Sequence, residues 1–215
     1  MVRLLSCAVS VALCFAQSLP VALAAAPSEI TKLSVIPIRN GVNEIDDFAG
    51  DGRPAIIVGG WRDNGNAHGG DLFLVMLQSP SGRGKWNVVT VQRKPDELER
   101  EVVYDSPHTV EDAVSSVRFA HGLVDGKPAT LLIVATRDLG NATSSIDPVP
   151  VDIEFYRLVR REDGLFGWPP DYFDLVETVR SATPYCNSDL ALSKEIGLPL
   201  PEPYAGPNRD DGCLH

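Results

Sequence analysis

Residues 40–71 read N-G-V-N-E-I-D-D-F-A-G-D-G-R-P-A-I-I-V-G-G-W-R-D-N-G-N-A-H-G-G-D, and this stretch decides the fold. An acidic, glycine-rich loop at residues 46–53 precedes the short apolar run Ala55–Val58. A second polar loop, residues 62–68, follows that run. β-Branched residues bounded by glycine and aspartate are typical of a strand between turns. The stretch therefore predicts one strand flanked by two loops that are rich in hydrogen-bonding and metal-capable side chains.

Short apolar runs of the same kind recur along the rest of the chain. Residues 72–77 and 130–135 are apolar without a break, as expected of central strands covered on both faces. Residues 151–156 alternate apolar with polar side chains, which is typical of a strand with one wet face. Pro37 removes a ladder donor from residues 33–38 and predicts that this strand lies at an edge. Together these runs predict a mainly β chain folded as an antiparallel β-sandwich.

The pattern changes near the C-terminus. Residues 186–196 have helical spacing, with Asn187 or Ser188 as the N-cap and Gly197 just past the end. We therefore expect a short C-terminal helix packed on the sandwich. Residues 199–207 are rich in proline and predict an extended tail.

The N-terminus has the layout of a secretory signal peptide. Arg3 precedes an uncharged apolar stretch, and residues 22–24 read Ala-Leu-Ala, a small-x-small cleavage sequence. This pattern predicts a signal peptide at residues 1–24 and a single domain at residues 25–215, in the periplasm or secreted. A membrane anchor is the alternative, but polar residues and a proline interrupt the apolar run, which is short for a span.

Charge and hydropathy limit the partners. The formal net charge is −10, and the predicted signal peptide carries one Arg and no acid, so its removal leaves the chain more acidic still. Such a chain repels phosphate backbones, so no nucleic-acid partner is expected. There is no second apolar run of spanning length, so no membrane contact is expected after cleavage. The remaining partners are a small molecule or another protein, which the sequence does not specify.

Two cysteines remain after the predicted cleavage, Cys186 and Cys213. In an oxidising compartment two cysteines most simply form one disulfide, and two free thiols are the alternative. A disulfide here would close a loop of roughly 27 residues, which the chain-entropy model associates with about 3–4 kcal/mol of stabilisation.

The first polar loop has the outline of a calcium-binding loop. In such a loop alternate residues direct their oxygens toward the ion, and Asp47 and Asp51 occupy two of these positions. Asp46 could add a third carboxylate. The pattern is incomplete, because Ala49 occupies one ligand position and Val58 occupies the place of the bidentate glutamate. A calcium ion is therefore one hypothesis for this loop, and a polar turn whose aspartates accept backbone N–H groups is the other.

The second polar loop supplies candidate binding residues. Arg62, Asn66 and His68 lie close together in the sequence, where they could bind a partner or act structurally. No catalytic residues are predicted, because the chain lacks the G-x-S-x-G, H-E-x-x-H and serine β-lactamase motifs. We therefore expect a protein that is not an enzyme.

The same stretch resembles the exported carbapenem intrinsic-resistance proteins, the CarG-like family. The resemblance is carried by residues 40–46, by Gly50-Asp51-Gly52 and by residues 62–68. It implies a β-sandwich with short terminal helices, a homodimer, a bound cation and protection against a carbapenem by a route other than hydrolysis. The function expected from it is that of an exported, non-enzymatic binding or protection protein.

Two other functions remain open. The implied fold is also similar to periplasmic inhibitors of invertebrate-type lysozyme, which present a Ser-Gly-x-Tyr loop. Residues 81–84 read Ser-Gly-Arg-Gly, so the tyrosine of that loop is missing here. Gly-Asp-Gly loops also occur in calcium-binding FG-GAP repeats, so a calcium-stabilised structural or adhesion module is the third hypothesis.

Overall fold

The structure is a computed structural model, and it describes residues 29–63, 65, 69–81, 84–93, 100–104, 113–140, 142, 146–161, 168–202, 204 and 209–213. The predicted signal peptide at residues 1–24 lies outside this range. The described chain is mainly β, as predicted, with one short helix near the C-terminus. Its strands are β1 (Ile30–Ile36), β2 (Gly41–Ile45), β3 (Ala55–Arg62), β4 (Gly70–Gln78), β5 (Trp86–Gln92), β6 (Val102–Tyr104), β7 (Ser115–Val124), β8 (Lys127–Arg137), β9 (Val151–Arg160) and β10 (Asp171–Arg180).

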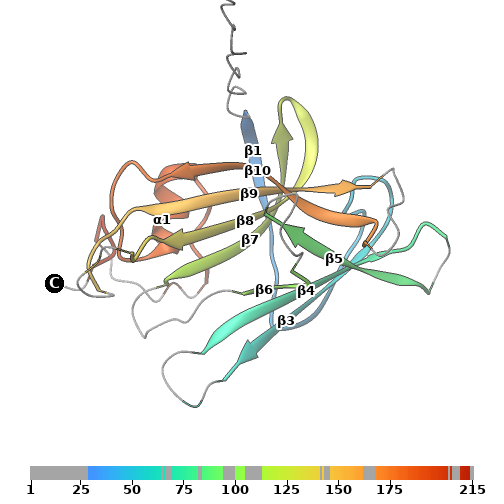
Figure 1. The fold of residues 1–215 in the computed structure, drawn as a ribbon, viewed down its shortest axis with the longest axis horizontal. Coiled ribbons are helices and arrows are strands. Elements are labelled where there is room, and N and C mark those ends of the chain that lie inside the picture. The colour runs from blue at the N-terminus through green and yellow to red at the C-terminus, as the bar shows by residue number, and fades with distance from the viewer. Residues whose placement is uncertain are drawn as a thin grey trace, which may run out of the picture.

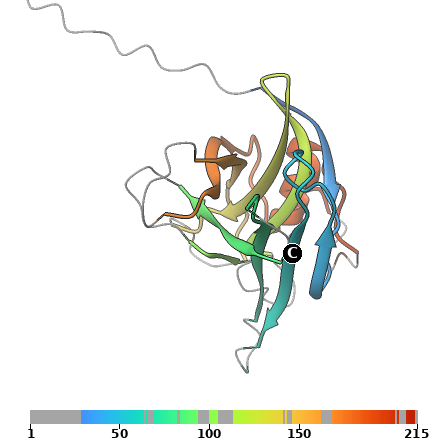
Figure 2. The same cartoon turned by 90° about the vertical axis from the view of Figure 1, so that its right-hand side faces the viewer.

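The strands form one continuous, curled sheet in the order β1-β7-β8-β9-β10-β5-β4-β3-β2, with β6 paired to β4. The two walls of this half-barrel are β7 to β10 and β3 to β5 (Figure 1). β1 and β2 are its two edges, and a short connection passes from one edge to the other (Figure 2). The edge position predicted from Pro37 is confirmed, since β1 ends one residue before it.

The predicted sandwich differs from the observed sheet at one pairing. β10 pairs with β5 in parallel, with Tyr172 opposite Thr90 and Phe173 opposite Val91. This pairing joins the two halves into a mixed sheet, where a sandwich would keep two separate antiparallel sheets. The partners are about eighty residues apart in the chain, a separation at which local patterns specify no pairing.

The inner face of the half-barrel holds the main core. Strands from both walls contribute to it, and the sheet alternates inward apolar side chains with outward ones. The fully buried members include Phe48, Ile57, Leu77, Leu132 and Phe173.

A second apolar cluster lies on the outer face of β7, β8 and β9, where the helix α1 (Ser188–Ile196) covers it. This double burial explains why residues 130–135 are apolar without a break. The predicted cap is confirmed: the Asn187 side chain accepts hydrogen bonds from the backbone N–H groups of Asp189 and Leu190. Gly197 ends the helix in the left-handed conformation, with φ of 72°.

A disulfide joins Cys186 to Cys213, as predicted, and ties residues 209–213 to the start of α1. The Cys186 backbone N–H also donates a hydrogen bond to the Asp211 carbonyl. Among the described residues, no helix is long and apolar enough to cross a membrane. A disulfide is compatible with an exported protein.

Candidate functional site

The acidic loop at residues 46–53 has a structural role at one end of the half-barrel. The Asp47 carboxylate accepts a hydrogen bond from the Gly52 N–H, and Asp47 itself has a φ of 48°. Asp51 accepts hydrogen bonds from the Arg53 backbone N–H and from Arg53 Nε, the latter at 2.7 Å. Two of the predicted calcium ligands therefore hold the turn closed, in the way expected of a polar Asx-type loop.

Arg53 then fastens this loop to β10. Its guanidinium forms two hydrogen bonds to the Asp171 carboxylate, at 3.0 and 3.1 Å. Arg160 approaches the same carboxylate at 3.3 Å, and the Asp171 side chain is only 1% exposed. Burial alone would lower the pKa of Arg53, but its hydrogen bonds to Asp171 and Asp51 raise that pKa overall, so the guanidinium stays charged.

Phe48 fills this end of the interior. Its ring is fully buried and lies 6.5 Å, centroid to centroid, from the rings of Phe119 and Phe173. The Thr130 hydroxyl donates a hydrogen bond to the Phe48 carbonyl, which fixes the loop across the strands. We call the part of the half-barrel that is filled by residues 46–53 the closed end.

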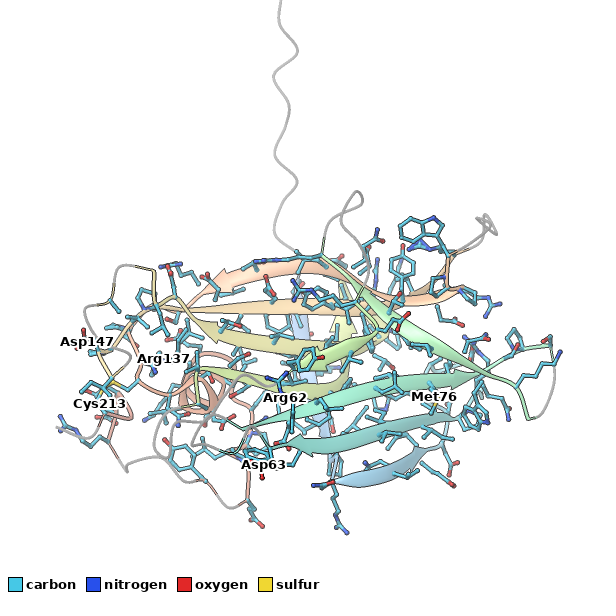
Figure 3. The ribbon with its side chains drawn as sticks, turned by 60° about the horizontal axis from the view of Figure 1, so that its bottom comes forward. Arg62, Asp63, Met76, Arg137, Asp147 and Cys213 are labelled. Atoms are coloured by element: carbon cyan, nitrogen blue, oxygen red, sulfur yellow. A yellow bond between two sulfur atoms is a disulfide. The ribbon has the colours of Figure 1, made fainter. Side chains whose placement is uncertain are left out.

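The first polar loop and the described start of the second, Arg62 and Asp63, are separated in space. They lie at the two ends of β3, whose eight residues span about 26 Å at ~3.3 Å per residue. Arg62 and Asp63 mark one end of the β3–β4 hairpin, and Met76, which pairs with Ile56, lies toward the other (Figure 3).

Asn66 and His68, the other predicted binding residues, lie outside the described residues, as does the centre of the Ser81–Gly84 turn. Within the described chain no group of three or more His, Cys, Asp or Glu could hold a metal ion. The calcium site at Asp46, Asp47 and Asp51 therefore remains a prediction, and the contacts of Asp47 and Asp51 give it no ligand set.

A cavity of about 400 Å³ occupies the opposite end of the interior, which we call the open end. This volume lies within the range of small-molecule pockets, and the mouths of β-barrels are common places for them. β5, β6, β7, β8 and β9 all contribute to its walls. The lining residues are Val91, Arg93, Arg100, Val102, Val103, Tyr104, Ser115, Val134, Thr136, Asp152, Glu154 and Tyr156.

The wet face predicted for residues 151–156 is the wall of this cavity. Asp152, Glu154 and Tyr156 point inward, whereas Ile153 and Phe155 belong to the core under α1. The alternation was readable from the sequence, but its wet side faces the cavity at the open end, where the Asp152 side chain is 37% exposed and the Glu154 side chain 12% exposed. This alternation was the available signal for a site that the sequence reasoning missed.

A polar chain of Tyr156, Glu154 and Arg93 lies in the cavity wall, in which Tyr156 is buried and Arg93 is exposed. Tyr156 Oη donates a hydrogen bond of 2.7 Å to Glu154 Oε2, and Arg93 Nη2 lies 2.6 Å from Glu154 Oε1. Arg93 and Glu154 therefore form an ion pair, and Glu154 Oε1 accepts no hydrogen bond from the described residues. Burial first, and then the hydrogen bond to Glu154 and its charge, raise the pKa of Tyr156 well above its usual value.

Arg62 connects the β3–β4 hairpin to the rim of the cavity. Its guanidinium lies 5.9 Å from the centroid of the Tyr104 ring, and Tyr104 lines the cavity. Tyr104 pairs with Leu72 across β6 and β4. The predicted binding residue Arg62 thus lies beside the cavity, whereas the predicted metal ligands Asp47 and Asp51 lie at the closed end.

β6 separates β4 from β5 beside the cavity. β5 pairs with β4 as far as Val89, and beyond that residue the segment 100–104 lies between the two strands, bridging Val91 of β5 and pairing with β4. β6 has only three residues and its pattern carries no periodic signal, so this strand could not be predicted from the sequence.

Comparison with known proteins identifies the fold but no family. No family model matches the chain, and a search of curated proteins finds no significant match. Among solved structures, the crystal structure of CarG aligns with a TM-score of 0.59 at 19% sequence identity. The alignment covers 75% of this chain and 94% of the CarG chain, and it shows a CarG-like fold.

Proposed function

We propose that this chain is an exported, non-enzymatic binding protein. It protects against a carbapenem by binding the drug in the cavity at the open end. The observation that carries the proposal is the cavity itself, in which apolar walls and a few convergent polar groups meet inside a CarG-like fold. The resemblance of residues 40–68 to carbapenem intrinsic-resistance proteins supports the choice of ligand. The absence of hydrolase motifs from the sequence supports protection without hydrolysis.

The test is expression of the full chain in a carbapenem-susceptible bacterium. The minimal inhibitory concentration should rise, while drug incubated with purified protein stays intact by mass spectrometry. Thr136→Trp is the matched variant, because Thr136 is exposed on the cavity wall and an indole there would fill the cavity. Unchanged tolerance with the wild-type chain, or equal protection by the Thr136→Trp chain, would contradict the proposal.

A homodimer is the second part of the proposal, and the outer face of β2, β3 and β4 is the surface we assign to it. A cross-strand row of apolar side chains runs over this face through Val42, Val58 and Leu74. Val42 is 68% exposed, and the core clusters of the described chain include none of these three. The helix α1 packs on β7, β8 and β9, away from this face.

Sedimentation equilibrium tests the dimer. The wild-type chain should sediment as a dimer, and Leu74→Glu should shift it to a monomer because a carboxylate at a dry interface is costly. Thr178→Glu, on the exposed side of β10, is the control that should leave the dimer intact. A monomeric wild-type chain would rule this interface out.

A further inference from the structure

One of the charged side chains that line the cavity has no ion-pair partner among the described residues. Four charged side chains line it: Arg93, Arg100, Asp152 and Glu154. Glu154 is paired with Arg93 at 2.6 Å, and Asp152 is paired with Arg180 at 2.9 Å. Arg100 is the remaining charge, and no carboxylate of the described chain forms an ion pair with it. Asp138, the second partner of Arg180, does not line the cavity.

The backbone holds Arg100 in place at the cavity. Its N–H donates to the Val91 carbonyl at 2.9 Å, and its carbonyl accepts from the Val91 N–H at 2.8 Å. Because both hydrogen bonds go to a core residue, the base of this side chain is fixed relative to the pocket. Arg100 and Tyr156 line the same cavity.

The rest of the lining suits an amphipathic ligand. Val91, Val102, Val103 and Val134 provide apolar walls, and the hydroxyls of Ser115 and Thr136 lie 3.4 Å apart on the paired strands β7 and β8. A ligand with an apolar skeleton and one anionic group would bury its skeleton against the valines. Its anion would accept charge-assisted hydrogen bonds from the guanidinium.

We infer that the cavity selects small organic anions, carboxylates or sulfonates on an apolar skeleton, and that Arg100 is the residue that binds the anionic group. This inference rests on the proposed function, because it specifies the ligand class of the same cavity. The chain as a whole carries a net charge of −10, so Arg100, which has no ion-pair partner among the described residues, contributes a local charge of the opposite sign at the cavity. At physiological ionic strength the charges farther than about 8 Å from the ligand are screened, and the local cation decides the preference.

Two matched probes test the inference. 1-Anilinonaphthalene-8-sulfonate and N-phenyl-1-naphthylamine share one aromatic skeleton, and only the first carries an anion. Fluorescence titration of the full chain should show tighter binding of the sulfonate. Arg100→Gln should weaken the sulfonate by roughly fivefold, since Arg100 is partly solvated, and should leave the neutral probe unchanged. Arg39→Gln, which removes an exposed arginine outside the cavity, is the control and should alter neither titration.

The outcomes separate this inference from the proposed function. Thr136→Trp should abolish binding of both probes, which shows that the cavity is the site. If the wild-type chain binds both probes equally in the cavity, or if Arg100→Gln leaves the preference intact, the anion inference is wrong and the binding function stands. If Thr136→Trp leaves both titrations unchanged, the probes bind elsewhere and both ideas fail. Circular dichroism of each variant confirms that it is folded.

Discussion

The two ends of the half-barrel use similar residue types for opposite purposes. At the closed end, the carboxylates of Asp47, Asp51 and Asp171 are satisfied by backbone N–H groups and by Arg53, and the buried Phe48 ring packs in the core beside them in sequence. At the open end the interior is left as a cavity, and Arg100 has no acidic partner in the described chain. A cluster of acids in the sequence therefore marks the end that stabilises the fold, whereas the cavity is lined by residues that are scattered along the chain.

The largest expected effect lies at the closed end. Phe48→Ala should lower the free energy of unfolding by about 3–5 kcal/mol, because it leaves a cavity between Phe119 and Phe173. Urea denaturation measures this change. Tyr104→Ala is the matched truncation at the open end, where the side chain is 53% exposed, and it should cost less than about 1 kcal/mol. Equal losses would remove the contrast between the two ends.

The disulfide should have the next largest effect. Replacing Cys186 and Cys213 together by Ala should lower the free energy of unfolding by about 3–4 kcal/mol, as the chain-entropy model gives for a bridge with a sequence separation of 27. Because the bridge holds residues 209–213 against α1, away from the cavity lining, probe binding should persist in the folded variant. Loss of binding at a temperature where the variant is folded would contradict this separation.

Breaking the link between Arg53 and Asp171 should cost somewhat less. Asp171→Asn leaves the largely buried Arg53 guanidinium without its ionic partner on β10, and a loss of about 2–3 kcal/mol is expected. Asp51→Asn is the control, because Asp51 is 48% exposed and such surface pairs contribute about 0–1 kcal/mol. Chemical denaturation of the two variants measures both losses in the free energy of unfolding. A larger loss for Asp51→Asn than for Asp171→Asn would contradict the account.

The smallest effect concerns Asp174 and pH. Burial raises the pKa of Asp174, which the charges of Arg157 and Arg161 only partly offset. The folded state therefore binds this proton more tightly than the unfolded state does. As pH rises from about 3.8 through the raised pKa, ionisation of Asp174 lowers the free energy of unfolding.

Asp174→Asn should accordingly stabilise the chain at pH 7 by less than about 1 kcal/mol after allowance for solvent screening, and the gain should fade as pH falls below about 4. Thermal melts of both proteins across this pH range measure the difference. A gain that grows toward acid pH would reverse the sign and contradict the account.

Local patterns were sufficient to predict the elements but not their assembly. The β-branched runs, the helix cap at Asn187 and the pairing of Cys186 with Cys213 were readable because each depends on neighbouring residues or on simple counting. The parallel pairing of β5 with β10 was not, because it joins segments about eighty residues apart and only tertiary structure sets its register. That one pairing turns the expected sandwich into a half-barrel.

The candidate site was harder to predict for a related reason. Asp47 and Asp51 stood out because they are close in sequence to Arg62, yet β3 separates them from it by its full length. The residues that line the cavity are spread over the chain from Val91 to Tyr156. β6, which lies between β4 and β5 at the cavity, has no periodic pattern. The alternation at residues 151–156 was the one local indication of the cavity. The sequence does not show whether the polar face of that strand borders a cavity or bulk solvent.

The most direct test of the central claim is a calorimetric titration of imipenem into the wild-type chain and two variants. Thr136→Trp fills the open end, and Asp51→Asn removes a carboxylate from the closed end. The account predicts saturable binding to the wild-type and Asp51→Asn chains and none to Thr136→Trp. Binding that survives Thr136→Trp, or that is lost in a folded Asp51→Asn chain, would show that the open end is not the binding site.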